Sequence, residues 1–159
     1  MKVLFLDVDG VLNCWTTKVL TLHGYKFVER KFVKRVKRIV DETGCKIVLS
    51  STWRKGYYDL LKDKVSDEES NDADDYVLLH NMFQFYGIEI YSHTPMLNES
   101  HRGLEIEEWL KNTTDEVEKF VILDDDIRVY PYTENLVSTF LDSGLTEELT
   151  EKVIKMLNE

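Results

Sequence analysis

The sequence predicts an α/β domain with a mainly parallel, five-stranded sheet and helices on both of its faces. Five short apolar runs alternate with segments whose apolar residues recur at helical spacing, and this alternation is typical of repeated βαβ units. Three of the runs end in clustered polar side chains, and ligands of such sheets bind beyond the carboxyl ends of the strands. We expect residues 1–159 to form a single domain, because the chain is too short for two sizeable cores.

The expected strands are apolar runs that stop at turn-forming or charged residues. The first, residues 2–6, is too short for a typical helix and is followed directly by Asp, and soon by Gly. The other four span residues 46–50, 87–92, 119–124 and 135–140. Together they supply the five strands of the predicted sheet.

The expected helices are recognised by apolar residues three or four positions apart. This spacing holds for residues 32–40, 76–86, 104–110 and 149–157. Gly44 is the expected stop of the first helix, and Thr146 is the expected N-cap of the last. Residues 63–75 hold seven acids, and we interpret them as a solvated loop.

Charge and composition restrict the partners of the chain. The formal net charge of −10 disfavours non-specific adhesion to nucleic acid or anionic membranes, although it allows a local basic site. No segment has the apolar length of a membrane span, and the N-terminus lacks the apolar region of a signal peptide. Two cysteines are too few for a disulfide framework. We therefore expect a cytoplasmic protein that does not bind membranes, and the sequence leaves its oligomeric state open.

Two carboxylates, Asp7 and Asp9, follow the first strand and are separated by one residue. Residues i and i+2 of an extended segment point to the same side, so both can face one cavity. Like charges this close need a compensating cation or a shared proton, and Mg²⁺ fits because it prefers oxygen ligands. Gly10 then allows a tight turn or the close approach of a ligand. The alternative is an Asp- and Gly-rich turn after an edge strand.

A second acidic cluster, Asp124, Asp125 and Asp126, lies at the end of the run at 119–124. Acids at two strand ends far apart in the sequence are the pattern that assembles a metal site from neighbouring strands. Surface loops with three acids are common, so this cluster indicates a metal site only in combination with Asp7 and Asp9. Which two of the three acids bind the metal stays open.

Groups that suit a phosphate lie at the end of the second strand. Ser50, Ser51 and Thr52 supply hydroxyls and backbone N–H groups, and Arg54 could add a bidentate, charge-assisted contact. The alternative is a cluster that caps the N-terminus of a following helix.

Arg102 precedes the helix at 104–110, where its charge could offset that of a bound phosphate and of the acids. Taken alone, such an arginine is more often a solvated surface residue. We place Trp53 and Trp109 in the hydrophobic core. The four histidines share no metal-ligand spacing, so none is assigned to a site.

In this order the four clusters resemble the motifs of the haloacid-dehalogenase (HAD) superfamily of phosphohydrolases. The first motif matches the Asp-x-Asp-Gly-Val-Leu of residues 7–12, and the others match Ser50, Arg102, and Asp124 with Asp125. The third motif more commonly holds a lysine, and Lys111 is a second candidate for it. The finer pattern is similar to small HAD domains of RNA-repair and polynucleotide-kinase-type phosphatases, in the strings at residues 47–54, 102–110, 121–126 and 144–148.

The resemblance implies a three-layer, Rossmann-like HAD fold and a two-step phosphoryl transfer. Asp7 would attack phosphorus and form an aspartyl-phosphate, and Asp9 would protonate the leaving oxygen and then activate water. Mg²⁺ would be held by the Asp7 carboxylate, the Asp9 backbone carbonyl, Asp125 and Asp124. The phosphoryl oxygens would be held by Ser50, the Ser51 amide and Arg102.

The segments between the motifs are too short for a full cap domain, so an open site with a minimal cap is implied. Such a site suits a large or chain-end substrate, and the leading hypothesis is a Mg²⁺-dependent phosphomonoesterase acting on nucleic-acid 3′-phosphate ends or nucleotides. The net charge of −10 favours the alternative, a phosphatase of small metabolites or nucleoside monophosphates. An alternative of another class is a HAD-fold binding or regulatory module without catalysis, against which the intact Asp7 and Asp9 argue.

Overall fold

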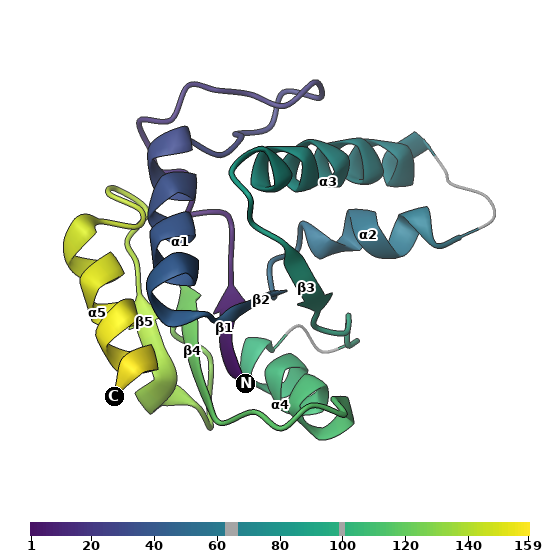
Figure 1. Ribbon diagram of the computed structural model, residues 1–159. Helices are drawn as coiled ribbons and strands as arrows, with labels where there is room; N and C mark the ends of the chain where they lie inside the picture. The colour runs from purple at the N-terminus through teal and green to yellow at the C-terminus, as the bar shows by residue number, and fades with distance from the viewer. Residues whose placement is uncertain (63–66, 99–100) are drawn as a thin grey trace.

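The computed structural model describes residues 1–62, 67–98 and 101–159, and its centre is a five-stranded parallel sheet. The strands are β1 (Lys2–Leu6), β2 (Lys46–Leu49), β3 (Ile90–His93), β4 (Lys119–Asp124) and β5 (Leu136–Ser138), in the spatial order β3-β2-β1-β4-β5 (Figure 1). Every neighbouring pair is parallel. The predicted α/β class and five-stranded sheet are confirmed, and β1 is the central strand.

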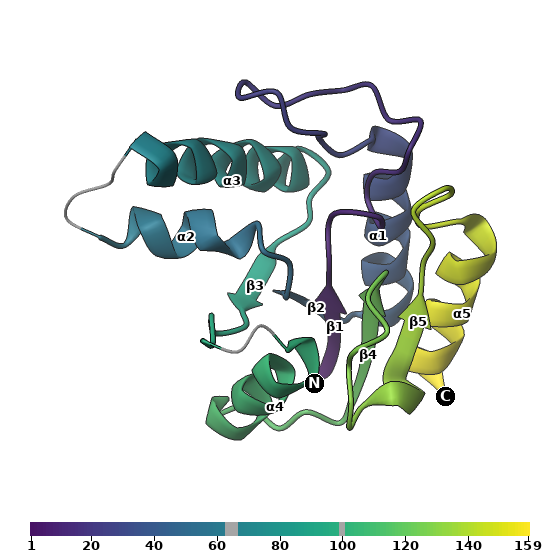
Figure 2. The ribbon, with the colours of Figure 1, turned by 180° about the vertical axis from the view of Figure 1, so that it is seen from behind.

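Five α-helices lie in the described residues: α1 (Arg30–Thr43), α2 (Arg54–Leu60), α3 (Asp67–Phe85), α4 (Arg102–Asn112) and α5 (Glu147–Asn158). Figures 1 and 2 show α1 and α5 together on one face of the sheet and α4 on the opposite face. The expected stop of α1 is confirmed, because Gly44 is its C-cap with a left-handed φ of 69°. The expected N-cap of α5 is confirmed as well, since the Thr146 side chain accepts a hydrogen bond from the Leu149 N–H.

The two faces of β1 bury two separate apolar clusters. Leu4 and Leu6 belong to the cluster that includes residues of α1, α3 and α5, whereas Val3 and Phe5 belong to the cluster of α4. Trp109 of α4 packs edge-to-face on Phe5 with ring centroids 5.4 Å apart, which confirms its expected place in the core. Side chains at odd-numbered positions of β1 therefore point toward α4.

The acidic stretch between β2 and β3 differs from its prediction. Residues 67–75 form the first half of α3, so their assignment to a loop is wrong, and residues 63–66 lie outside the described part. α3 packs against α2, and its acids meet lysines in or just after that helix: Lys55 pairs with Asp72, and Lys62 pairs with Glu69 at 2.8 Å. These pairs offset the like charges that disfavour an isolated helix.

The strand bounds differ from the predictions by up to three residues at the outer strands. β3 begins at Ile90, and β5 ends at Ser138, whereas the sequence predicted 87–92 and 135–140. Both are edge strands of the sheet, where fewer neighbours sustain a regular ladder. The central strand β1 and its neighbour β4 have the bounds that the sequence predicted.

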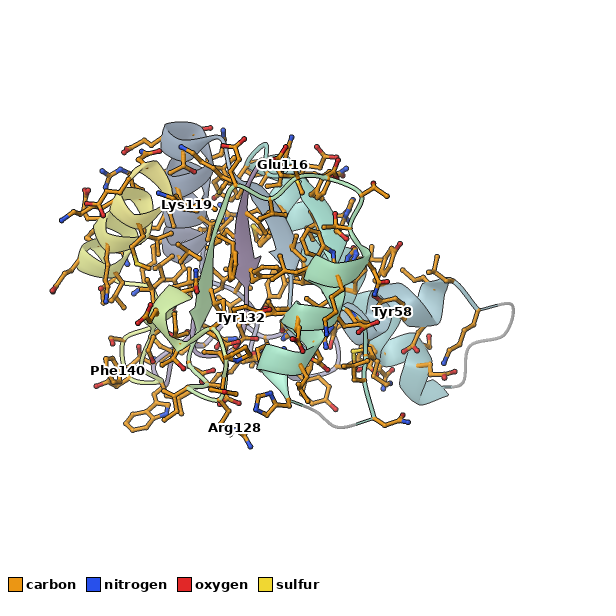
Figure 3. The ribbon with its side chains drawn as sticks, turned by 90° about the horizontal axis from the view of Figure 1, so that it is seen from below. Tyr58, Glu116, Lys119, Arg128, Tyr132 and Phe140 are labelled. Atoms are coloured by element: carbon orange, nitrogen blue, oxygen red, sulfur yellow. The ribbon has the colours of Figure 1, made fainter. Side chains whose placement is uncertain are left out.

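The carboxyl ends of all five strands lie at one edge of the sheet. Figure 3 shows Arg128 and Phe140, which follow β4 and β5, at this edge and Lys119, where β4 begins, at the opposite edge. We call this edge, where the strands end, the site edge. The loop of residues 13–29 and the pair α2 and α3 lie beside it, which agrees with a minimal cap. Within the described residues, no helix is both long and apolar enough to cross a membrane.

Candidate active site

Asp7 is the first residue after β1 and lies buried at the centre of the site edge. Because side chains alternate along the strand, Asp7 continues the direction of Val3 and Phe5, toward α4. Its side chain is 5% exposed, and its backbone N–H donates to the Leu123 carbonyl oxygen of β4 at 3.0 Å. The residue predicted as the nucleophile is therefore held in a fixed, water-poor position.

Arg102 is the cation that contacts Asp7. It begins α4, and its Nε lies 2.8 Å from Asp124 Oδ2, while Nη2 lies 3.5 Å from Asp7 Oδ1. Lys111, the second candidate from the sequence, lies in the last turn of α4, where it is 62% exposed and pairs with Glu107. The structure brings Arg102, and not Lys111, to the acids.

The two buried acids are difficult to ionise together. Burial raises the pKa of the Asp7 carboxyl well above its ordinary value, and Asp124 raises it further, while Arg102 lowers it. Burial also raises the pKa of Asp124, and Arg102 opposes that shift. An additional positive charge would favour the ionised form of both groups.

Three carboxylates could hold a cation that supplies this charge. One oxygen from each of Asp7, Asp124 and Asp125 lies within 4.8 Å of the other two, and clustered carboxylate oxygens suit Mg²⁺. Asp126 is engaged elsewhere, because its carboxylate pairs with Arg128 at 2.8 Å. The acidic triplet therefore divides: Asp124 and Asp125 face the site, and Asp126 faces Arg128.

The charges around the cluster also fit a divalent cation. Buried Glu105 of α4 lies 2.6 Å from Arg54 and 3.8 Å from Arg102, so it adds a fourth carboxylate to the three of the cluster. These four carboxylates face two guanidinium groups, so full ionisation would leave an excess of two negative charges, which one Mg²⁺ would balance. The residues present thus fit the metal that the sequence predicts.

Asp9 lies on the open side of the site. Its carboxylate is exposed and accepts hydrogen bonds from the Asn13 amide at 2.9 Å and from the Trp53 indole N–H at 3.1 Å. Its side-chain oxygens are not part of the three-carboxylate cluster, which leaves its backbone carbonyl as the group for the predicted metal contact. Sequence reasoning missed both Asn13 and Trp53 as site residues. Trp53 packs against the core as expected, but its indole N–H is directed to Asp9.

Gly10 shapes the turn that separates Asp7 from the following loop. Its φ of 77° is in the left-handed region that favours glycine, and a Cβ at this position would collide with the Asp125 carboxylate. Its N–H donates to Asn13 Oδ1 at 2.9 Å, and its carbonyl accepts from the Thr139 hydroxyl at 2.7 Å. The structure therefore supports the predicted turn at Gly10, whose N–H is engaged within that turn, and the close approach of a ligand or phosphate stays a prediction.

Ser50 and Ser51 lie where β2 ends, beside the end of β1. The Ser50 N–H donates to the Leu6 carbonyl at 3.0 Å. The Ser50 hydroxyl is fully buried without a hydrogen-bond partner among the described residues, an unfavourable state that an acceptor or donor from a ligand would relieve. Ser51 Oγ accepts from the Trp53 N–H at 3.2 Å, and α2 has no side-chain N-cap, so the capping alternative does not describe these serines.

Arg54 is engaged by the protein itself, which argues against the predicted phosphate contact. Its side chain is 1% exposed. Its N–H groups donate to the carbonyl oxygens of Thr94 (2.9 Å), Ser50 and Ser51 (2.7 Å each) and Pro95 (3.1 Å). Its Nη2 also contacts Glu105 at 2.6 Å. Arg54 thus joins the end of β2 to the end of β3 and has no donor directed at a ligand.

Residues 3–150 match the family described as HAD domain in Swiss Army Knife RNA repair proteins. The match covers most of the chain and includes all the clusters described above, from Asp7 to Asp125. It agrees with the resemblance that the motifs carry. Comparison with curated proteins and with solved structures yields no match.

Proposed function

We propose that this chain, which belongs to the family of HAD domains in Swiss Army Knife RNA repair proteins, is a Mg²⁺-dependent phosphomonoesterase. Family membership supports a HAD-type phosphatase in general. The finer proposal rests on one arrangement, in which buried Asp7 belongs to an acidic cluster that Arg102 contacts through both Asp7 and Asp124, while Asp9 lies on the open side. The substrates that we propose are nucleic-acid 3′-phosphate ends or nucleotides.

In the first step, a carboxylate oxygen of Asp7 attacks the phosphorus atom of the substrate and forms the aspartyl-phosphate bond. The bond between phosphorus and the leaving oxygen breaks, and Asp9 gives that oxygen a proton. The exposed position of Asp9 supports this role, because the leaving group reaches the site from solvent.

In the second step, Asp9 is ionised and accepts a proton from a water molecule. That water attacks the aspartyl-phosphate, which releases inorganic phosphate and restores the Asp7 carboxylate. The hydrogen bonds from Asn13 and Trp53 hold the Asp9 carboxylate in place during both steps. We therefore assign positioning roles to Asn13 and Trp53.

The charge on the transferring group is balanced by residues of the buried side. Arg102 and the Ser50 hydroxyl, which has no partner in the described part of the chain, bind phosphoryl oxygens. Asp7, Asp124 and Asp125 would hold Mg²⁺ together with the Asp9 backbone carbonyl, and the bound metal supplies positive charge that stabilises the phosphoryl group in the transition state. Arg54 acts as a positioning residue, because its donors fix the carbonyl groups that end β2 and follow β3.

Three observations bear on the substrate. The family description names RNA repair proteins, and the limited structure beside the site supports a chain-end substrate. The net charge of −10 instead supports the second candidate, a phosphatase of small metabolites or nucleoside monophosphates, because an acidic surface repels long polyanions.

The test is a substrate panel measured with and without Mg²⁺. It compares a 3′-phosphorylated oligonucleotide, mononucleotides and a generic aryl phosphate, with the variant Asp7→Asn as the inactive reference. We expect Mg²⁺-dependent phosphate release that Asp7→Asn abolishes, and a higher kcat/KM for the oligonucleotide. Equal or lower activity on the oligonucleotide would assign the function to the small-phosphate candidate, and no release from any substrate would favour the binding module.

A further inference from the structure

A cavity of about 290 Å³ lies beside Asp9, and Asp7 is not among the residues that line it. Its walls come from the loop before α1, the turn after β2 and helix α3, through Tyr25, Trp53 and Asp75. The loop and α3 lie side by side in Figures 1 and 2 and are joined by His23 and Asp74 at 3.1 Å. If Asp9 protonates the leaving oxygen, the part of the substrate bonded to that oxygen lies beside Asp9, on the side of this cavity.

Asp75 is the residue that points to a ligand. Its side chain is 7% exposed, it lines the cavity, and its Oδ1 has no hydrogen-bond partner among the described residues. Burial raises the pKa of this carboxyl, and a hydrogen bond from Thr21 opposes that shift. A buried carboxylate oxygen without a donor is unfavourable. An N–H or O–H group from a ligand would relieve that cost.

The lysines of the cavity are already engaged, which disfavours a second phosphate there. Lys26 Nζ donates to the Cys14 and Trp15 carbonyl oxygens at 2.9 Å each. Lys55 pairs with Asp72, which also lines the cavity. With three carboxylates on its walls and both lysines bound, the cavity suits a neutral group that donates hydrogen bonds.

The aromatic side chains of the cavity suit a flat group. Trp53 and the 61% exposed Tyr25 both line it, and aromatic rings bind nucleobases of any sequence by stacking. The cavity volume is just below the range of about 300–1,000 Å³ typical of drug-sized ligands. It therefore has room for one base and not for several nucleotides.

We propose that this cavity binds the nucleobase of the nucleotide that carries the phosphate, with Asp75 accepting a hydrogen bond from an N–H group of the base. The inference rests on the proposed function and makes it more specific, because the base next to the phosphate becomes part of what the site recognises. A free nucleotide and the end of a nucleic-acid chain can both present the group that this site would recognise, a nucleoside 3′-phosphate.

The test compares kcat/KM for guanosine 3′-monophosphate with that for ribose 3-phosphate, which lacks the base. We expect a preference for the nucleotide of at least about tenfold in wild type, and its loss in Asp75→Asn and in Tyr25→Leu. The matched control is Asp41→Asn, an exposed carboxylate of α1 that pairs with Lys37 and does not line the cavity, and it should keep the preference. Because Tyr25 is exposed, the Leu variant tests the cavity even if Asp75→Asn does not fold.

A wild-type ratio near one, or an unchanged ratio in both cavity variants, would overturn the inference. A second comparison uses 3′-phosphorylated oligonucleotides that end either in guanosine or in an abasic sugar. It shows whether the cavity also recognises the base when the nucleotide is a chain end and not a free nucleotide. If no substrate is hydrolysed, the proposed function fails, and guanosine binding, measured by isothermal titration calorimetry, still tests the cavity. Saturable binding that Tyr25→Leu weakens would support the base site, and no binding in wild type would exclude it.

Discussion

Asp7 and Asp9 are two residues apart in the chain, yet their surroundings are opposite. Asp7 is 5% exposed and contacts the mostly buried Arg102, whereas Asp9 is exposed and is held by the neutral donors Asn13 and Trp53. In the proposed function, the buried side balances the charge that every phosphate ester carries, and the open side contacts the part of the substrate that differs from one ester to another.

The largest expected effect separates the two carboxylates by activity. Asp7→Asn should lower kcat by at least about 10⁴-fold, because it removes the group that bonds to phosphorus. Asp9→Asn should lower kcat by about 10²–10⁴-fold, the range typical of general acid–base catalysis. Steady-state phosphate release at saturating Mg²⁺ measures both. Equal activity of Asp7→Asn and wild type would contradict the assignment of different catalytic roles to Asp7 and Asp9.

Arg102 tests whether the buried side carries the charge of the phosphoryl group. Arg102→Ala should lower kcat/KM by about 10²–10³-fold, since it removes a cation aimed at the developing charge. The matched control is Lys111→Ala, which removes an exposed positive charge from the same helix and should keep the wild-type value. A comparable loss in both variants would show that α4 acts only through its general positive charge.

Arg54 tests whether the buried side also holds the strand ends together. Arg54→Lys cannot reproduce the fork of donors to four carbonyl oxygens and Glu105, so we expect a loss of about 3 kcal/mol in the free energy of unfolding. Urea unfolding measures this loss. The control, Arg38→Lys, alters exposed ion pairs and should cost less than about 1 kcal/mol. A similar stability for both variants would contradict the assigned role of Arg54.

Trp53 tests how the open side holds its acid. Trp53→Phe keeps an aromatic ring against the core and removes only the indole N–H that donates to Asp9, so kcat should fall about tenfold. Trp109→Phe is the control, because its indole N–H donates to Ser92, away from the site. A fall in stability without a fall in kcat would leave Trp53 a purely structural residue.

The smallest expected effect is a gain of stability in the absence of metal. Because burial and Asp124 raise the pKa of Asp7, its ionisation at neutral pH costs folding free energy, and Asp7→Asn should stabilise the metal-free protein by ~1 kcal/mol, or about 2–4 °C. The sign follows from linkage: the cost is absent below the ordinary carboxyl pKa of about 4 and grows as the pH rises toward the raised value. Thermal unfolding at pH 4 and pH 7 with a chelator measures it, and equal gains at both pH values would contradict this assignment.

The sequence predicted the framework of both sides better than their supporting contacts. β1, β4 and the convergence of Asp7 and Asp124 at one sheet edge follow from periodicity and from parallel-strand geometry, which are local or general rules. The place of Arg102 beside them was implied by the resemblance to the HAD motifs. Asn13 and Glu105 carry no such local signal, because their partners come from turns and helices whose packing only the fold defines.

Arg54 shows why spacing alone does not establish a phosphate contact. It lies close to Ser50 in the sequence, as a phosphate ligand would, but burial against α4 and the strand ends consumes its donors. The assignment of the acids of α3 to a loop failed for a similar reason. Lysines in and just after α2 pair with these acids only once the two helices pack. In both cases a charged side chain is satisfied by a segment distant in the sequence.

The most direct test of the division between Asp7 and Asp9 is to trap the covalent intermediate. Asp9→Asn is mixed with an aryl phosphate and Mg²⁺, quenched in acid, digested and analysed by mass spectrometry. An aryl leaving oxygen needs no proton from Asp9, whereas the water that hydrolyses the intermediate still needs a base, so we expect a phosphoryl group on the peptide that contains Asp7. Phosphate release without phosphorylation of Asp7, or phosphorylation that persists in the double variant with Asp7→Asn, would contradict the account.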